Sequence, residues 1–100
     1  MKIVLNRCFG GFSLSDKACE YLCTDDKYYY TYACGDEIAQ KMRTETALVK
    51  CIEELGKDAN GSCANLGIVE IPDEATDWEI NEYDGLESVI YVLNGKIYHA

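Results

Sequence analysis

The sequence predicts a single α/β (α+β) domain in which two helices pack on a mixed β-sheet that ends in a C-terminal β-hairpin. One hundred residues are enough for one core of two layers. Apolar residues make up 48% of the chain and charged residues 27%, which is typical of a globular protein. Segments rich in strand formers alternate with two segments of helical periodicity, in the order β-α-β-(β)-α-β-β-β-β. We therefore expect residues 1–100 to form one domain, with both helices on the same face of the sheet.

The chain begins with a predicted buried strand over residues 2–9, which are rich in β-formers. Gly10 and Gly11 end this strand. Serine and aspartate residues that follow are typical of a helix start, so we expect a first helix from about Asp16 to Cys23.

The next segment is unusually aromatic. Residues 28–32 contain four tyrosines and have a very high strand propensity. Residues 37–43 fit either a helix or a strand that pairs back on the tyrosine segment. Of these two alternatives, the hairpin is favoured.

Residues 44–55 form the clearest helical pattern in the chain. Thr44 can cap the helix, and Gly56 is a typical stop. One apolar stripe is expected to face the core, and it consists of Leu48, Cys51, Ile52 and Leu55.

The C-terminal part reads as strands. Residues 66–71 form an apolar segment that ends at a proline, and residues 78–83 alternate apolar with polar side chains. Residues 89–93 and 96–98 flank Asn94-Gly95, the strongest hairpin signal in the sequence.

Negative charge is concentrated in one part of the chain. The net charge is −9, and residues 58–95 contain no lysine or arginine. Such a surface repels the phosphate backbone, so no binding of nucleic acid is expected. It suits a basic protein partner, or it keeps the protein soluble. The nine acids of this region are Asp58, Glu70, Asp73, Glu74, Asp77, Glu79, Glu82, Asp84 and Glu87.

Six cysteines are present, and the predicted compartment decides their state. The apolar start of the chain is too short for a secretory signal, and no apolar run is long enough to span a membrane. A cytoplasmic protein with no membrane contact is therefore expected. Because the cytoplasm keeps thiols reduced, we expect free cysteines, most of them buried.

A strand, a glycine turn and a predicted helix start follow one another at residues 6–15, and this order is typical of an anion site. The only arginines of the chain precede the two predicted helices, where two guanidinium groups could hold a phosphate. The alternatives are a tight turn without a ligand and arginines paired with surface acids. The candidate ligand-binding residues are Asn6, Arg7, Gly10, Gly11, Phe12, Ser13 and Arg43.

Other chemistries have weaker signals. The tyrosines at 28–32 could stack a purine, although packing in a core or a dimer is the simpler role. The cysteine spacing does not match a metal site, and the only histidine, His99, is next to last. The acids Glu79, Glu82, Asp84 and Glu87 are expected on a solvated strand face. We predict no metal, no cofactor and no catalytic residue, and enzymatic activity stays open.

Three segments resemble a family of small proteins carried by bacteriophages and prophages. They are KIVLNRCFGGFSLS, LVKCIEELGKDANGSCANLGIVEIPD and WEINEYDGLE, which make up half of the chain, and the resemblance as a whole extends over about two-thirds of it. In that family the segment before the second helix tends to read Pro-Arg-Asp-Asp-Pro. Here it reads Met42-Arg43-Thr44-Glu45-Thr46, which keeps the arginine and an acid but neither proline.

The resemblance implies an accessory protein that counters host defence in the host cytoplasm. The first hypothesis is therefore a binding protein that sequesters a small anionic, nucleotide-derived signal at the candidate residues. The second is an acidic inhibitor that uses residues 70–87 to bind a basic host protein. The third is a nucleotide-processing enzyme. A homo-oligomer is also expected, because the aromatic edge and the C-terminal hairpin could pair with a second copy.

Overall fold

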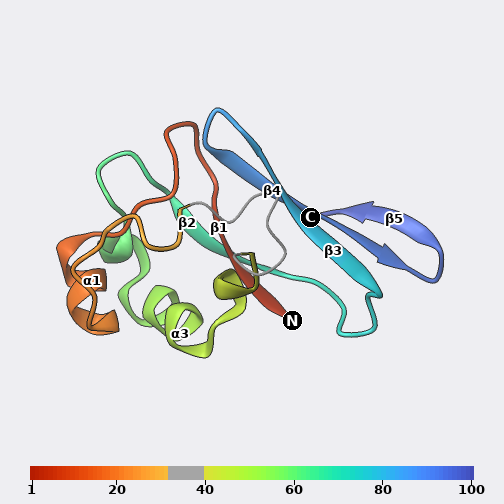
Figure 1. Ribbon diagram of the computed structural model, residues 1–100, viewed down its shortest axis with the longest axis horizontal. Helices are drawn as coiled ribbons and strands as arrows, with labels where there is room; N and C mark the ends of the chain where they lie inside the picture. Colours follow the sequence, from red (N-terminus) through yellow and green to blue (C-terminus); the bar gives the residue numbers. More distant parts are fainter. Residues whose placement is uncertain (32–39) are drawn as a thin grey trace.

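The computed structural model describes residues 1–31 and 40–100, and it has the predicted α+β class with a C-terminal hairpin (Figure 1). Two helices, two 3₁₀ turns and five strands are described. Their bounds are β1 Lys2–Asn6, α1 Asp16–Leu22, η1 Met42–Thr44, α3 Thr46–Leu55, η2 Gly56–Ala59, β2 Leu66–Glu70, β3 Asp77–Tyr83, β4 Leu86–Leu93 and β5 Lys96–His99.

The described strands form two antiparallel sheets instead of the single mixed sheet that the sequence predicts. β1 pairs with β2, and β3, β4 and β5 form a second sheet in that order. The turns explain the second sheet. Asp84-Gly85 and Asn94-Gly95 all have positive φ, the backbone shape of the two-residue turns that join antiparallel strands.

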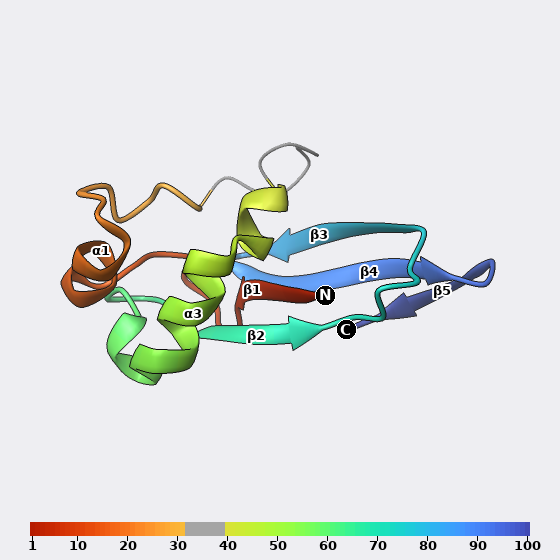
Figure 2. The same cartoon turned by 90° about the horizontal axis from the view of Figure 1, so that it is seen from below.

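Two apolar clusters hold the layers together, and β1 contributes to both because its side chains alternate. Val4 faces the helices, where it packs with Leu14 and Leu48. The opposite face of β1 packs on the second sheet, through a cluster of Ile3, Leu5, Ile71, Ile80 and Val89. Figures 1 and 2 both show α1 and α3 at one end of the molecule and β5 at the other. Both helices contribute to the cluster on the Val4 face of β1, so they share one side of β1–β2, as predicted.

Both helices end where their local sequence indicates. Ser15 caps α1, since its hydroxyl accepts a hydrogen bond from the backbone N–H of Ala18. Gly56 follows α3 with a φ of 55°. The predicted cap of α3 is wrong, because the helix begins after Glu45 and the Thr44 hydroxyl donates to the carbonyl of Lys41.

The predicted tyrosine strand is wrong over the described residues 28–31, which form successive turns. The Asp26 carboxylate accepts the N–H of Tyr28, and the N–H of Thr31 bonds to the carbonyl of Tyr28. Tyr30 is buried among the helices, and its hydroxyl donates to Glu45 at 2.8 Å. Side-chain packing and local hydrogen bonds therefore override strand propensity.

The predicted hairpin at 37–43 is also wrong where it can be compared. Residues 40 and 41 are helical and lead into η1, whereas residues 37–39 lie outside the described part. The Gln40 side chain donates to the carbonyl of Trp78 and accepts the N–H of Ile80. This amide takes the place of a neighbouring strand at the edge of β3.

The five described cysteines are free thiols, as predicted, but most of them are not buried. Cys19 and Cys51 lie in the helical core, whereas Cys23 and Cys63 are exposed. No described helix has the length and apolar character that crossing a membrane requires.

Candidate functional site

Three loops that are distant in sequence meet at one end of the two sheets, and we call this region the loop end. It consists of residues 6–13, 60–65 and 82–87, and Figure 1 shows the first and last of these loops side by side. Backbone hydrogen bonds join the loops. They run from Gly10 N–H to Asp84 O (3.0 Å), from Arg7 N–H to Asn65 O (2.8 Å) and from Gly61 N–H to Ser13 O (3.0 Å).

The glycines of the loop end allow backbones to approach each other. Gly10 and Gly85 have φ of 145° and 90°. A Cβ on Gly85 would lie 2.3 Å from the amide nitrogen of Gly11, and one on Gly10 would lie 2.3 Å from the carbonyl oxygen of Cys63. The space beside the turn is thus filled by the chain's own backbone, which supplies a structural reason for the glycines.

A buried ion pair lies beneath these loops. The side chain of Arg43 is fully buried, and that of Glu87 is 3% exposed. Arg43 makes five hydrogen bonds, the full number that a guanidinium can donate. They run to Tyr30 O (2.7 Å), Val4 O (3.0 Å), Thr31 O (3.3 Å), Glu87 Oε1 (2.6 Å) and Glu87 Oε2 (2.8 Å).

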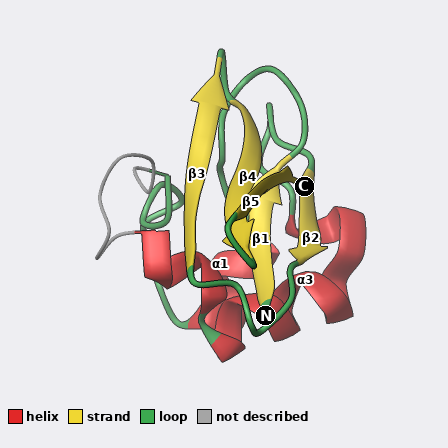
Figure 3. Cartoon of the chain, turned by 90° about the vertical axis from the view of Figure 1, so that its right-hand side faces the viewer, coloured by secondary structure: helices red, strands yellow, loops and turns green. Residues whose placement is uncertain are grey.

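Neighbouring groups complete this network. The ring of Phe12 lies 3.9 Å from the guanidinium carbon of Arg43, and the backbone N–H of Asn6 donates to Glu87 Oε1 at 2.7 Å. The Asn6 amide donates to the carbonyl oxygens of Cys8 and Gly85. Figure 3 shows β1 close to β4, where these bonds join the two sheets. Every buried side-chain polar atom in the described part of the chain has a partner.

The seven candidate ligand-binding residues lie in or around this network. Asn6, Phe12 and Arg43 are buried, so the polar groups of Asn6 and Arg43 and the ring of Phe12 face the protein interior. Arg7 is exposed, yet its Nη1 donates to the backbone carbonyl of Glu87 at 2.9 Å. Gly10 and Gly11 contact the turn of β3 and β4. Arg7 thus donates to the backbone carbonyl of Glu87 and Arg43 to its carboxylate, so the two guanidinium groups do not form a shared phosphate site.

Sequence reasoning missed Glu87, which was expected on a solvated strand face. The register of β4 places Glu87 on the same face as Val89, and that face is buried against β1. The spacing of two residues from Val89 is the signal that could have found it.

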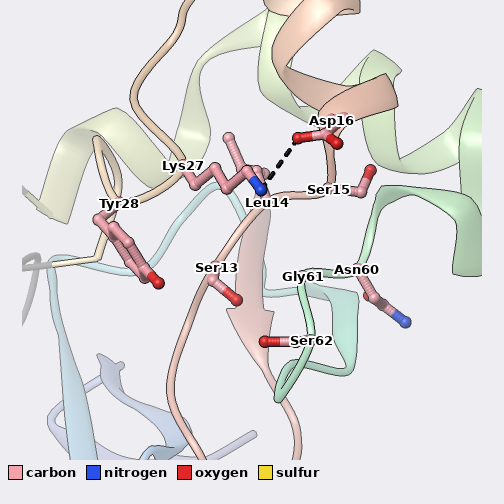
Figure 4. A pocket seen from close by; sticks show the side chains of 9 residues that line it. All are labelled: Ser13, Leu14, Ser15, Asp16, Lys27, Tyr28, Asn60, Gly61 and Ser62. Atoms are coloured by element: carbon pink, nitrogen blue, oxygen red, sulfur yellow. Dashed lines mark ion pairs between the residues drawn. The ribbon is translucent and has the colours of Figure 1, made fainter.

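A polar hollow of about 280 Å³ opens beside the first loop (Figure 4). Lys27 approaches the Asp16 carboxylate to 2.9 Å, and this carboxylate raises the pKa of Lys27. Ser15 is already engaged, since its hydroxyl caps α1 and donates to the carbonyl of Asp58. The remaining polar lining residues are Ser13, Tyr28, Asn60 and Ser62.

The second sheet has one face that no described element covers, and we call it the outer face. The inner face carries Ile80 and Val89, so the register places their sequence neighbours on the opposite side. The outer face has an apolar centre with acids beside it, and its side chains are Asp77, Glu79, Asn81, Tyr83, Leu86, Ser88, Ile90, Val92, Ile97 and His99. A hollow of about 210 Å³ lies over this centre.

Comparison of the chain with protein-family models, with curated proteins and with solved structures finds no match. The resemblance to phage-borne proteins therefore stays a prediction. Its three quoted segments include all the residues that form the loop end.

Proposed function

We propose that this protein is a binding protein whose outer face docks on a basic surface of a partner protein. The observation that carries this proposal is the combination of an uncovered apolar centre with an acidic border. Ile90, Val92 and Ile97 form the centre, and Asp77 and Glu79 stand beside them on β3. An apolar centre within a polar rim is the usual anatomy of a protein interface.

The charge distribution supports a basic partner. All the acids of residues 70–84 are exposed, and the region 58–95 carries no lysine or arginine. A surface of one sign accelerates association with a surface of the opposite sign and disfavours other partners. The phage resemblance makes a host defence protein our proposed partner, in a counter-defence role in the host cytoplasm.

Affinity capture from a bacterial lysate, followed by titration with the purified partner, tests this proposal. The wild-type protein should retain a basic protein, and Glu79→Lys should weaken the complex at least tenfold. Binding should also weaken as salt rises from 50 to 300 mM, because salt screens the attraction between the charges.

Glu20→Lys is the matched control. It makes the same charge change on an exposed position of α1, far along the chain from the outer face. Equal losses for Glu20→Lys and Glu79→Lys would contradict docking by the outer face, because only net charge would then matter.

The polar hollow supports a second candidate function, the capture of a small anionic nucleotide-like ligand. The Lys27 ammonium, the Tyr28 phenol and the Ser13 and Ser62 hydroxyls line one space between loops, and they could contact phosphate and base. The carboxylate of Asp16 pairs with Lys27 and would repel an anion in this hollow, so we rank ligand capture as the second candidate function.

Thermal-shift measurements against a panel of cyclic dinucleotides and ADP-ribose derivatives test this second function. A selective ligand at a hundred times its Kd should add about 2.7 kcal/mol to the free energy of unfolding. Lys27→Ala should abolish the shift, whereas Lys17→Ala on the exposed side of α1 should not. A flat panel would contradict nucleotide capture.

A further inference from the structure

Two exposed aromatic rings stand together at the loop end. Phe9 is 65% exposed and Tyr83 is 72% exposed, although both are large apolar side chains. Their ring centroids are 6.4 Å apart and the ring planes meet at 77°. Phe9 comes from the loop after β1, and Tyr83 is the last residue of β3 on the outer face.

The backbone beneath these rings is fixed. Gly10, next to Phe9, donates its N–H to the carbonyl of Asp84, next to Tyr83. The Gly85 backbone packs on Gly11 with no space for a side chain. The backbone that carries the two rings is therefore set before any partner arrives, which lowers the ordering entropy that binding costs.

Two carboxylates flank one ring of the pair in sequence. Glu82 and Asp84 flank Tyr83, both are exposed, and Glu82 Oε1 accepts the N–H of Gly85 at 2.7 Å. In the described part of the chain, the one cation–π contact is that of Arg43 over Phe12 in the interior. The described cations of this protein thus leave the rings of Phe9 and Tyr83 open.

We infer that Phe9 and Tyr83 form a docking point for an arginine side chain of the basic protein partner. A planar guanidinium stacks on an aromatic face, while its N–H groups donate to the carboxylate of Asp84 beside Tyr83. Arginine fits better than lysine, because an ammonium is more strongly hydrated and does not stack as a plane. This inference rests on the proposed function, since it names the partner group that the end of the outer face receives.

Titration with two synthetic peptides, acetylated tetra-arginine amide and tetra-lysine amide, tests the docking point. Both peptides carry the same charge, so the difference between their affinities measures what the planar guanidinium adds, and the ring variants below separate stacking from its hydrogen bonds. The wild-type protein should bind tetra-arginine about two- to fivefold more tightly than tetra-lysine. Aromatic NMR signals of Phe9 and Tyr83 should shift with the arginine peptide.

Four variants test which side chains carry the arginine preference. Phe9→Ala and Tyr83→Ala should each reduce the arginine preference toward one, whereas Tyr21→Ala, which removes a 38% exposed aromatic ring on α1, should keep it. Asp84→Asn should weaken both peptides while the preference survives. Equal binding of the two peptides by the wild type would overturn the inference, as would an unchanged preference in Phe9→Ala.

The outcomes separate this inference from the proposed function. If the peptides show no preference but Glu79→Lys still abolishes partner binding, the arginine site is wrong and the outer face stands. If the arginine preference depends on Phe9 but Glu79→Lys leaves the affinity for the partner protein unchanged, the docking point is real and the outer-face function is wrong.

Discussion

Among the residues of the described core, Arg43 and Glu87 are the two whose replacement should lower the free energy of unfolding most. Removing one partner of a buried, hydrogen-bonded pair leaves the other charge uncompensated, which costs about 3–5 kcal/mol. Here each partner also holds the backbone, since Arg43 bonds to three carbonyls and Glu87 accepts the N–H of Asn6. The pair therefore acts as a joint between β1, β4 and the segment before α3.

Arg43→Met and Glu87→Gln should each lower the free energy of unfolding by about 3–5 kcal/mol in urea titrations. The double variant should lose less than the sum of the two, because each single change already breaks the same bonds. Lys17→Met, which breaks an exposed pair with Asp58, should leave the urea midpoint unchanged. Additive losses in the double variant would contradict the coupling.

Gly85 and Gly95 form a matched test of the loop contact. Both have positive φ, at 90° and 76°, but a Cβ meets the Gly11 backbone only at Gly85 and meets open space at Gly95. Gly95→Ala should cost about 1–2 kcal/mol from backbone strain alone. Gly85→Ala should cost about 1–3 kcal/mol more, because it also overpacks the loop end. Equal losses in thermal or urea unfolding would show that the contact is unimportant.

At the scale of elements, the segment 27–31 depends on the packing of Tyr30 against α3. Burial, together with the hydrogen bond to Glu45, raises the pKa of the Tyr30 phenol above its ordinary value. The folded chain then keeps this proton at a pH where the unfolded chain releases it. Stability from this group is complete below about pH 10 and falls as the pH rises above that value.

The free energy of unfolding should therefore fall between about pH 10 and 11 in the wild type, and less steeply in Tyr30→Phe. Tyr28→Phe is the control, since Tyr28 is 58% exposed. Urea titrations at each pH measure the slope. Parallel curves for the wild type and Tyr30→Phe would contradict this role of Tyr30.

The helical core also protects two thiols. Burial raises the pKa of Cys19 and of Cys51, which keeps both protonated and poorly nucleophilic. Iodoacetamide at pH 8 should label Cys23 and Cys63 first and Cys51 only as the protein unfolds. Mass spectrometry of tryptic peptides measures each rate, and labelling of Cys51 as fast as Cys63 would contradict the packing of α3.

At the scale of the whole molecule, the predicted homo-oligomer is still to be tested. β5 is paired on one side by β4, and in the described part of the chain the backbone groups of Ile97 and His99 have no hydrogen-bond partner on the other side. Such an edge can pair with a second copy. Each copy carries a charge of −9, so salt should strengthen self-association, whereas it should weaken binding of a basic partner.

Sedimentation equilibrium should therefore give a mass above the 11.2 kDa of one chain at about 100 μM, and more so at high salt. Ile97→Lys should return the mass to one chain, because it places a charge in the apolar centre of the outer face. Lys96→Glu, at the hairpin tip, is a control for charge changes on β5. A single-chain mass at every salt concentration would exclude the oligomer.

The sequence by itself determined the elements that rest on local signals. The α+β class, the two helices, β2 and the C-terminal hairpin follow from periodicity, caps and the Asn94-Gly95 turn, all of which act within a few residues. The acidic character of the C-terminal half also follows from the sequence alone. The sequence also drew attention to both arginines, but it did not predict that both would donate hydrogen bonds to Glu87.

The tertiary structure decided what depends on contacts between distant segments. Tyr30 lies in the core because it packs against the helices and its hydroxyl donates to Glu45, and this packing overrides the strand propensity of its segment. Glu87 and Arg43 are 44 residues apart, and no local pattern reveals that each compensates the other's charge. The division into two sheets likewise follows from how the two faces of β1 are covered. Local energies specify local structure, but the burial of a charge or a ring depends on which partners the whole fold brings to it.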